Sequence, residues 1–368
     1  MKGFLGNYKM EKIARFIECL IPVTACNLKC EYCYIIQEQR RTDKAPVMHY
    51  SAVQIGKALN QERLGGTCYF SICGAGETLI PHETVEIAYE LLKAGHYVNI
   101  TTNGTLSKRF DEISQFPMEY RKHLHFSFSL HYLELAKRNL LDTFAQNVKR
   151  MRACGCSFVV QMNLYDGYIP YMHEIEDFCV KEFGAKPQVA ATRDEKDRTI
   201  RLYTALDKEE YWNIGQKMDS PLFDFTMKNF MVKRTEYCYA GDWSFILDLD
   251  TGVMRRCYNV PFGVDIFRDP SQPIPFMAVG KGCRKDFCVN SSHFLSLGVI
   301  PDLDTPTYME LRNREEAGWY TPEMKEFLSQ KLGNNHGRNS MLKKMKIIVT
   351  DQYRRKRLFF KRILNMKG

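Results

Sequence analysis

Three cysteines follow one another closely in a segment near the start of the chain. Cys26, Cys30 and Cys33 have the spacing C-x3-C-x2-C. Three thiolates at this spacing can ligate three irons of a 4Fe–4S cube and leave the fourth iron without a protein ligand. A structural zinc site usually has four closed ligands, and the loop supplies no fourth Cys or His. We therefore favour an iron–sulfur cluster with one open iron over a zinc site or chance clustering.

A second group of residues lies where expected strands end. Gly74, Ala75, Gly76 and Glu77 follow an apolar run. Such small residues allow the backbone to approach a ligand closely, and the carboxylate of Glu77 is able to accept a hydrogen bond from an ammonium group. Polar residues also end the next two expected strands. Because such ends face the ligand side of an α/β sheet, we expect Asn103 and Ser129 to border the same site.

Four further cysteines lie in the C-terminal half of the chain. Cys238 and Cys257 flank an expected hairpin, Phe245–Leu249 and Val253–Arg256, and Cys283 and Cys288 form a C-x4-C pair. Four thiolates complete one closed site, and both a second cluster and a four-cysteine zinc site satisfy that chemistry. We expect core packing for the remaining six cysteines: Cys19, Cys68, Cys73, Cys154, Cys156 and Cys179.

The first half of the chain alternates strand-like and helical patterns, which predicts a parallel sheet. The expected strands are Arg15–Val23, Thr67–Cys73, Tyr97–Thr102, His123–His131, Ser157–Leu164 and Pro187–Ala191. The expected helices are Ser51–Arg63, His82–Ala94, Leu106–Phe116, Leu141–Ala153 and Tyr171–Phe183. Six βα units are fewer than the eight of a complete barrel, so the fold class is α/β with a partial (β/α)6 TIM-type barrel. A small cysteine-rich α+β domain and a basic helical tail follow it.

These motifs resemble the radical S-adenosylmethionine superfamily over roughly residues 14–192. In that family, S-adenosylmethionine chelates the open iron through its amino and carboxylate groups. The reduced cluster then cleaves S-adenosylmethionine to methionine and a 5′-deoxyadenosyl radical. The radical chemistry therefore belongs to the cofactors, and the protein positions them. The resemblance implies cofactor contacts for Tyr32, Gly74, Ala75, Gly76, Glu77, Asn103 and Ser129. Ala75 and Thr78 depart from the family's commonest Gly-Gly-Glu-Pro form.

The C-terminal cysteines resemble the twitch subdomain, a short relative of the SPASM extension of that family. The resemblance implies one auxiliary 4Fe–4S cluster on Cys238, Cys257, Cys283 and Cys288, although the second pair is often more closely spaced in the family. We therefore divide the chain into a core (1–205), a helical linker (206–237), an auxiliary-cluster domain (238–300), a helical segment (301–336) and a basic amphipathic tail (337–368). Gly333–Gly337 reads as a linker before the helix Ser340–Lys367.

The charge distribution and the composition limit which partners and which location the protein can have. Residues 338–368 contain eleven Lys or Arg against Asp351 alone, so the basicity of the chain lies in its tail. Such a helix suits an anionic membrane, RNA, an acidic partner or packing on the body. No run of about 18 apolar residues occurs, and thirteen cysteines without an export signal indicate reduced thiols. We expect a cytoplasmic protein, with the inner face of the membrane as a further location.

The motifs together favour a radical S-adenosylmethionine oxidoreductase that takes a hydrogen atom from a sugar or other polar metabolite, to dehydrogenate or epimerise it. The expected electron donor is a low-potential protein such as flavodoxin or ferredoxin. Alternatives are peptide or protein modification by the same chemistry, a zinc-bound nucleic-acid-binding or regulatory protein, and a membrane-associated cluster scaffold. The sequence assigns neither the substrate, the oligomeric state nor an acid–base residue. Strand-end candidates for substrate contact are His131, Tyr132, Asp166 and Arg193.

Overall fold

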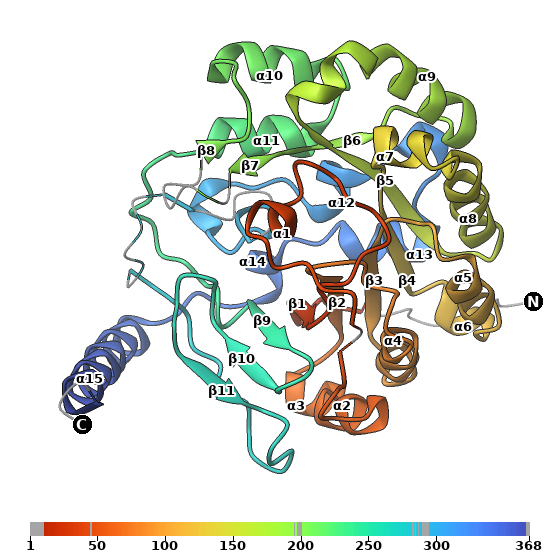
Figure 1. Ribbon diagram of the computed structural model, residues 1–368. Helices are drawn as coiled ribbons and strands as arrows, with labels where there is room; N and C mark the ends of the chain where they lie inside the picture. The colour runs from red at the N-terminus through yellow and green to blue at the C-terminus, as the bar shows by residue number, and fades with distance from the viewer. Residues whose placement is uncertain are drawn as a thin grey trace, which may run out of the picture.

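The computed structural model describes residues 11–44, 46–194, 196, 201–281, 283, 285, 287–288 and 294–365. Its centre is a nine-stranded sheet with the order β11-β10-β9-β1-β2-β3-β4-β5-β6 (Figure 1). Strands β1 to β6 run parallel to one another. They are β1 Arg15–Ile21, β2 Cys68–Gly74, β3 Tyr97–Thr102, β4 Leu124–Ser129, β5 Ser157–Leu164 and β6 Gln188–Ala191. The predicted α/β class with a partial (β/α)6 barrel is confirmed.

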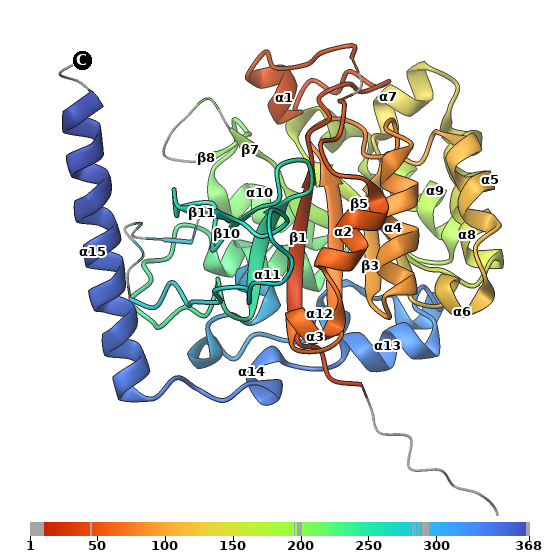
Figure 2. The same ribbon diagram turned by 90° about the horizontal axis from the view of Figure 1, so that it is seen from below.

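Helices cover the outer side of this sheet (Figure 2). In α4, Val85, Ala88 and Leu92 are buried at spacings of three and four residues, which places them on one face against the strands. The helix ends at Ala94. The next residue, Gly95, has a φ of 82°, a left-handed conformation that favours glycine. The helices of this half are α1 Tyr34–Gln37, α2 Ala52–Ala58, α3 Gln61–Leu64, α4 Glu83–Lys93, α5 Ser107–Ser114, α6 Met118–Arg121, α7 Tyr132–Lys137, α8 Leu141–Ala153 and α9 Met172–Phe183.

The inner side of the parallel strands carries polar residues at alternate positions. On β5, Phe158, Val160 and Met162 are buried, whereas Gln161 and Asn163 line a cavity on the inner side. Because successive side chains of a strand point to opposite faces, one strand serves both the core and the hollow. The pattern recurs on the neighbouring strands, where Asn99 Nδ2 donates to Ser71 Oγ (3.0 Å) and Ser127 Oγ donates to Asn99 Oδ1 (3.0 Å).

The parallel sheet continues into the C-terminal half of the chain. β9 (Ser244–Asp248) pairs in parallel with β1, and β10 (Val253–Arg255) and β11 (Gly263–Asp265) follow antiparallel. This confirms the predicted hairpin, whose turn is held by Asp248 Oδ1 accepting from the backbone N–H groups of Asp250 and Thr251. The predicted domain division at residue 238 stays a prediction. The three added strands belong to the same sheet as the core.

The remaining helices and strands lie outside the nine-stranded sheet. They are β7 Arg193–Asp194, β8 Arg201–Leu202, α10 Lys208–Gln216, α11 Pro221–Asn229, α12 Tyr308–Arg312, α13 Pro322–Leu328, α14 Leu332–Asn335 and α15 Met341–Asn365, with short 3-10 turns at Asp166–Tyr171, Leu295–Leu297, Pro301–Leu303 and Glu315–Ala317. Helix α15 confirms the predicted tail helix as far as Asn365; residues 366–368 lie outside the described residues. Among the described helices, none has the length and apolarity needed to cross a bilayer.

The prediction of a linker at Gly333–Gly337 is wrong. This segment contains α14, and its polar side chains bond to the chain just before β1. Asn335 Nδ2 donates to the carbonyl of Ile13 (3.2 Å), and His336 Nε2 lies 2.6 Å from the carbonyl of Ala14. Gly333, Asn334 and Asn335 lie within this short helix, which ends at His336, so their turn-forming composition does not mark a flexible connection.

Candidate functional site

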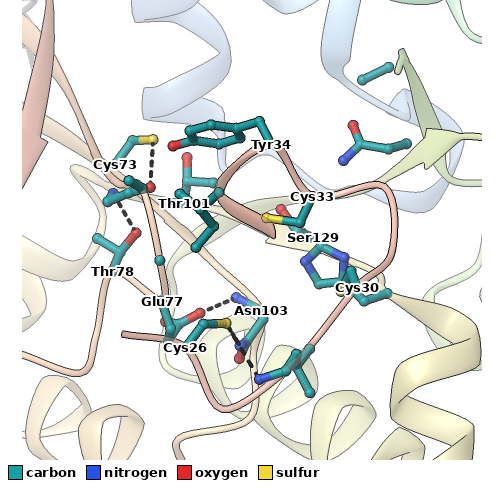
Figure 3. Close-up of a pocket in the computed structure, with 18 of the residues that line it drawn as sticks. Cys26, Cys30, Cys33, Tyr34, Cys73, Glu77, Thr78, Thr101, Asn103 and Ser129 are labelled. Carbon is teal, nitrogen blue, oxygen red and sulfur yellow. Dashed lines mark hydrogen bonds between the residues drawn. The ribbon is translucent and has the colours of Figure 1, made fainter. Parts of the chain in front are cut away.

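The three-cysteine loop leaves β1 and crosses the carboxyl ends of the parallel strands. Cys26, Cys30 and Cys33 all line one cavity of about 310 Å³ (Figure 3). The predicted cofactor contacts line it as well: Tyr32, Gly74, Ala75, Gly76, Glu77, Asn103 and Ser129. The fold thus brings the whole predicted first site together, at the edge where α/β sheets bind ligands.

Gly76 fixes the position of the cysteine loop. Its N–H donates to the carbonyl of Val23 (2.7 Å), and the N–H of Glu77 donates to the carbonyl of Ala25 (2.9 Å). A Cβ at Gly76 would lie 2.1 Å from the carbonyl oxygen of Ala25, which no side chain can tolerate. The glycine is therefore required by backbone packing directly before Cys26, in addition to any approach of a ligand.

The carboxylate of Glu77 is buried and joins the ends of two strands. Its Oε1 accepts from Thr102 Oγ1 (2.7 Å) and from the N–H of Leu79 (3.0 Å), and its Oε2 accepts from the N–H of Asn103 (2.8 Å). Burial raises the pKa of Glu77, and these three hydrogen bonds oppose the rise. Since a carboxylate offers about four acceptor positions, one further donor can be accommodated.

Asn103 connects the end of β3 to the cysteine loop. Its Nδ2 donates to Asn27 Oδ1 (2.8 Å) and lies 3.8 Å from Cys26 Sγ, and its Oδ1 accepts from Thr105 Oγ1 (2.6 Å). The N–H of Leu28 also points at Cys26 Sγ, at 3.4 Å. Donors directed at a sulfur favour its thiolate form, which is the form that ligates iron.

The three thiols are free in the structure; Cys30 is buried, and Cys26 and Cys33 are half-buried. Burial raises the pKa of Cys26 to about 11 and also raises the pKa values of Cys30 and Cys33. In the described part of the chain, no three Cys, His, Asp or Glu side chains are close enough to share one metal ion. In a 4Fe–4S cube each thiolate binds a different iron, so the three sulfurs need not converge on one point.

Tyr32 lies in a buried aromatic cluster beside the cysteines. Its hydroxyl lies 2.6 Å from His131 Nδ1 and 3.1 Å from the hydroxyl of Tyr168, and its ring packs on Tyr165 with centroids 4.6 Å apart. Burial lowers the pKa of His131 to about 4, so this ring is neutral at pH 7. The cluster makes the wall of the cavity next to Cys30 rigid and dry.

Several cavity residues escaped the sequence analysis; they lie on strands, on the cysteine loop and at the start of α1. Cys73, expected in the core, lines the cavity, and burial raises its pKa to about 12. Glu18, Tyr34, Gln161 and Asn163 also line it. The signal that could have identified the strand residues is a polar residue at every second position of an otherwise apolar run.

The four strand-end candidates for substrate contact divide into two pairs. His131 and Arg193 line the cavity. Asp166 instead holds a loop, accepting from Thr204 Oγ1 (2.5 Å) and from the N–H of Ala205 (2.7 Å). Tyr132 packs against Phe178 with ring centroids 5.9 Å apart.

The C-terminal cysteines gather at a second place. Cys238 pairs with Gly280 through two backbone hydrogen bonds of 3.2 and 2.8 Å, which bring the segment of Cys283 back beside it. Burial raises the pKa of Cys238, and the neighbouring thiols Cys257, Cys288 and Cys283 raise it further. The Cys238 thiol thus lies near enough to the other three predicted ligands to be affected by their charges, and the auxiliary site itself stays a prediction. The residues that separate Cys283 from Cys288 lie partly outside the described ones.

A direct contact joins the two cysteine sites. Tyr258, the residue after Cys257, donates its hydroxyl to the carboxylate of Glu18, which lines the first cavity. Glu18 therefore faces the hollow on one side and the segment of the auxiliary cysteines on the other.

Comparison with known proteins agrees with this site. Residues 20–179 match the sequence model of the Radical SAM superfamily, which supports a radical SAM superfamily domain over this part of the chain. That assignment implies a 4Fe–4S cluster and S-adenosylmethionine. Among curated protein sequences, none matches the chain.

Solved structures were also compared, and the similarities are at low sequence identity. Streptococcus suis SuiB bound to S-adenosylmethionine is 14% identical, with a TM-score of 0.50 over 70% of this chain and 64% of SuiB. The chain thus spans less than two thirds of that relative. Native anSMEcpe with bound AdoMet and the Cp18Cys peptide has 15% identity and a TM-score of 0.47, covering 85% and 95% of the two chains. BtrN in complex with AdoMet and 2-DOIA has 13% identity and a TM-score of 0.35, covering 87% and 94%.

The close approach at Gly76 gives a first test. In Gly76→Ala, the new Cβ must displace the backbone of Ala25, so Cys26 moves and we expect the anaerobically reconstituted protein to lose iron. Gly337→Ala is the matched control, because a Cβ at Gly337 meets no atom within 4 Å. Iron is counted per chain together with the thermal midpoint. Full iron loading of Gly76→Ala would show that this contact does not position the loop.

Proposed function

We propose that the chain is a radical S-adenosylmethionine enzyme that removes a hydrogen atom from a polar metabolite. The observation that carries the proposal is that one cavity is lined by all three loop cysteines and by the Gly74–Glu77 turn, Asn103 and Ser129. When bound there, a reduced 4Fe–4S cluster and S-adenosylmethionine supply a 5′-deoxyadenosyl radical. The free thiols, their spacing and the small residues beside them fit this pair of cofactors.

The protein's part is to bind, orient and keep out water. Cys26, Cys30 and Cys33 would hold three irons, and the donors of Asn103 and Leu28 steady the Cys26 sulfur. We assign the cofactor's ammonium to the remaining acceptor position of Glu77 and its ribose to Ser129. The buried cluster around Tyr32 shields the radical from solvent, which prevents side reactions.

The lining of a cavity that adjoins the first one favours a polar substrate. A second cavity of about 160 Å³ shares Glu18, Ser71, Thr101 and other lining residues with the first. Its side chains include hydroxyl, amide and carboxylate groups, which suit a sugar or another compact polyol. Dehydrogenation and epimerisation both begin with the same abstraction. A peptide or protein side chain remains the alternative substrate, and SuiB has been solved with its precursor peptide SuiA.

We further propose an auxiliary 4Fe–4S cluster on Cys238, Cys257, Cys283 and Cys288. Mutual proximity of the four thiols supports it. Such a cluster supplies an electron acceptor for a net oxidation. The hydrogen bond from Tyr258 to Glu18 supports this role, because Tyr258 follows Cys257 and Glu18 lines the first cavity.

The enzyme activity is tested by cleavage of the cofactor. Anaerobically reconstituted protein with dithionite and S-adenosylmethionine is expected to release 5′-deoxyadenosine, and Cys30→Ala is expected to release none, because two thiolates do not hold the cluster. Cys154→Ala, a cysteine outside both groups, should retain full release. Chromatography with mass detection measures the product. Equal release by wild type and Cys30→Ala, or none by either, would refute the proposal.

The auxiliary cluster is tested by counting metal. Cys257→Ala is expected to contain about four fewer irons per chain than the wild type while still cleaving S-adenosylmethionine, because the first site is intact. Iron, sulfide and zinc are measured on the same samples. One tightly held zinc per chain that is lost in Cys257→Ala would assign this site to structural zinc instead.

A further inference from the structure

Helix α15 stands at one side of the molecule, beyond β9, β10 and β11 (Figures 1 and 2). One face of the helix is tied to the body. Asp351 Oδ1 accepts from Arg256 Nη2 at 2.6 Å, with both side chains less than a tenth exposed, and Ile347 is buried in the core. Lys343 adds an ion pair with Asp242 at 3.4 Å. The part of α15 from Lys343 to Asp351 is thus tied to the body.

The opposite face of α15 is apolar and open to solvent. Six large side chains there are 48–80% exposed: Met341, Leu342, Met345, Ile348, Val349 and Tyr353. Their spacings of three and four residues place them on one side of the helix, about opposite Ile347 and Asp351. We call these six side chains the outer face of α15. A contiguous apolar group of this kind marks an interaction surface, whereas single exposed apolar residues are ordinary.

Basic side chains lie on and beside the outer face. Residues 341–365 contain nine Lys or Arg and one acidic residue, Asp351, whose charge is already paired with Arg256. Lys346, Lys356 and Arg357 are exposed, and helical spacing puts Lys346 and Arg357 along one border and Lys356 among the apolar side chains. The outer face is therefore apolar, with three exposed cations on it or along its border.

We propose that the outer face of α15 docks the protein on an anionic lipid surface. The apolar side chains would enter the boundary between headgroups and acyl chains, and the cations would meet the phosphates. Each Lys or Arg near such a surface contributes about 1 kcal/mol. The inference does not depend on the reaction in the cavity.

Other occupants fit the face less well. A second copy of α15 would bring its own cations against these cations. RNA would satisfy the cations and leave six apolar side chains in water, since its backbone is uniformly charged. An anionic membrane satisfies both properties at once.

The test is co-sedimentation of the full-length protein with vesicles. We expect binding to phosphatidylcholine vesicles that contain phosphatidylglycerol, little binding to phosphatidylcholine alone, and weakening by salt. Met345→Asp/Val349→Asp should lower the affinity for the anionic vesicles by at least about tenfold, through lost apolar burial and added negative charge. Val53→Asp/Met118→Asp is the matched control, because it places the same changes at exposed apolar positions of the body and should leave binding unchanged.

Three results would overturn the proposal. Equal binding by the two double variants would show that the outer face is not the contact. An absence of binding to anionic vesicles at low salt would exclude the lipid surface. Binding of single-stranded RNA that persists in Met345→Asp/Val349→Asp, without vesicle binding, would assign the cations to nucleic acid. Circular dichroism of each variant confirms that the helix is intact.

Discussion

The site depends above all on the contact between two backbones, Val23–Ala25 and Gly74–Glu77. Hydrogen bonds of 2.7 and 2.9 Å hold them together, and there is no room for a side chain between them. This contact fastens the cysteine loop to the end of β2, so that the three cysteines line the hollow. A parallel sheet supplies such a contact because its strand ends lie side by side at one edge.

Glu77 extends this constraint to the next strand. By accepting from Thr102 and from the N–H of Asn103, its carboxylate fixes the end of β3. Asn103 in turn fixes Asn27 in the cysteine loop. The chain of bonds is closed, from loop to β2 to β3 and back to the loop. A charge or dipole placed in such a network needs little reorganisation when a ligand arrives, which is the general basis of electrostatic preorganisation.

Much of this arrangement could be predicted from the sequence, and the reasons are local. Strands β3 and β5 lie where the apolar runs placed them, and the hairpin of β9 and β10 follows from its turn residues. The first cavity gathers the three loop cysteines, the Gly74–Glu77 turn, Asn103 and Ser129, whereas the strand-end candidates Tyr132 and Asp166 lie elsewhere. These signals succeed because each one depends on near neighbours in the chain.

What could not be predicted depends on distant pairings. Nothing in residues 244–248 indicates that β9 joins the edge of β1, because parallel pairing has no turn to mark it. For the same reason, Tyr258 could not be placed beside Glu18. Gly333–Gly337 carries the composition of a linker, and only the carbonyls of Ile13 and Ala14, far away in sequence, give it partners.

The central claim is that three thiolates leave one iron of the first cluster open to S-adenosylmethionine. Mössbauer spectroscopy of protein loaded with enriched iron, before and after the cofactor is added, tests it most directly. The account predicts that a single iron site changes its signal and that the others do not. A spectrum unchanged by S-adenosylmethionine, or a protein that binds zinc in place of iron at Cys26, Cys30 and Cys33, would contradict it.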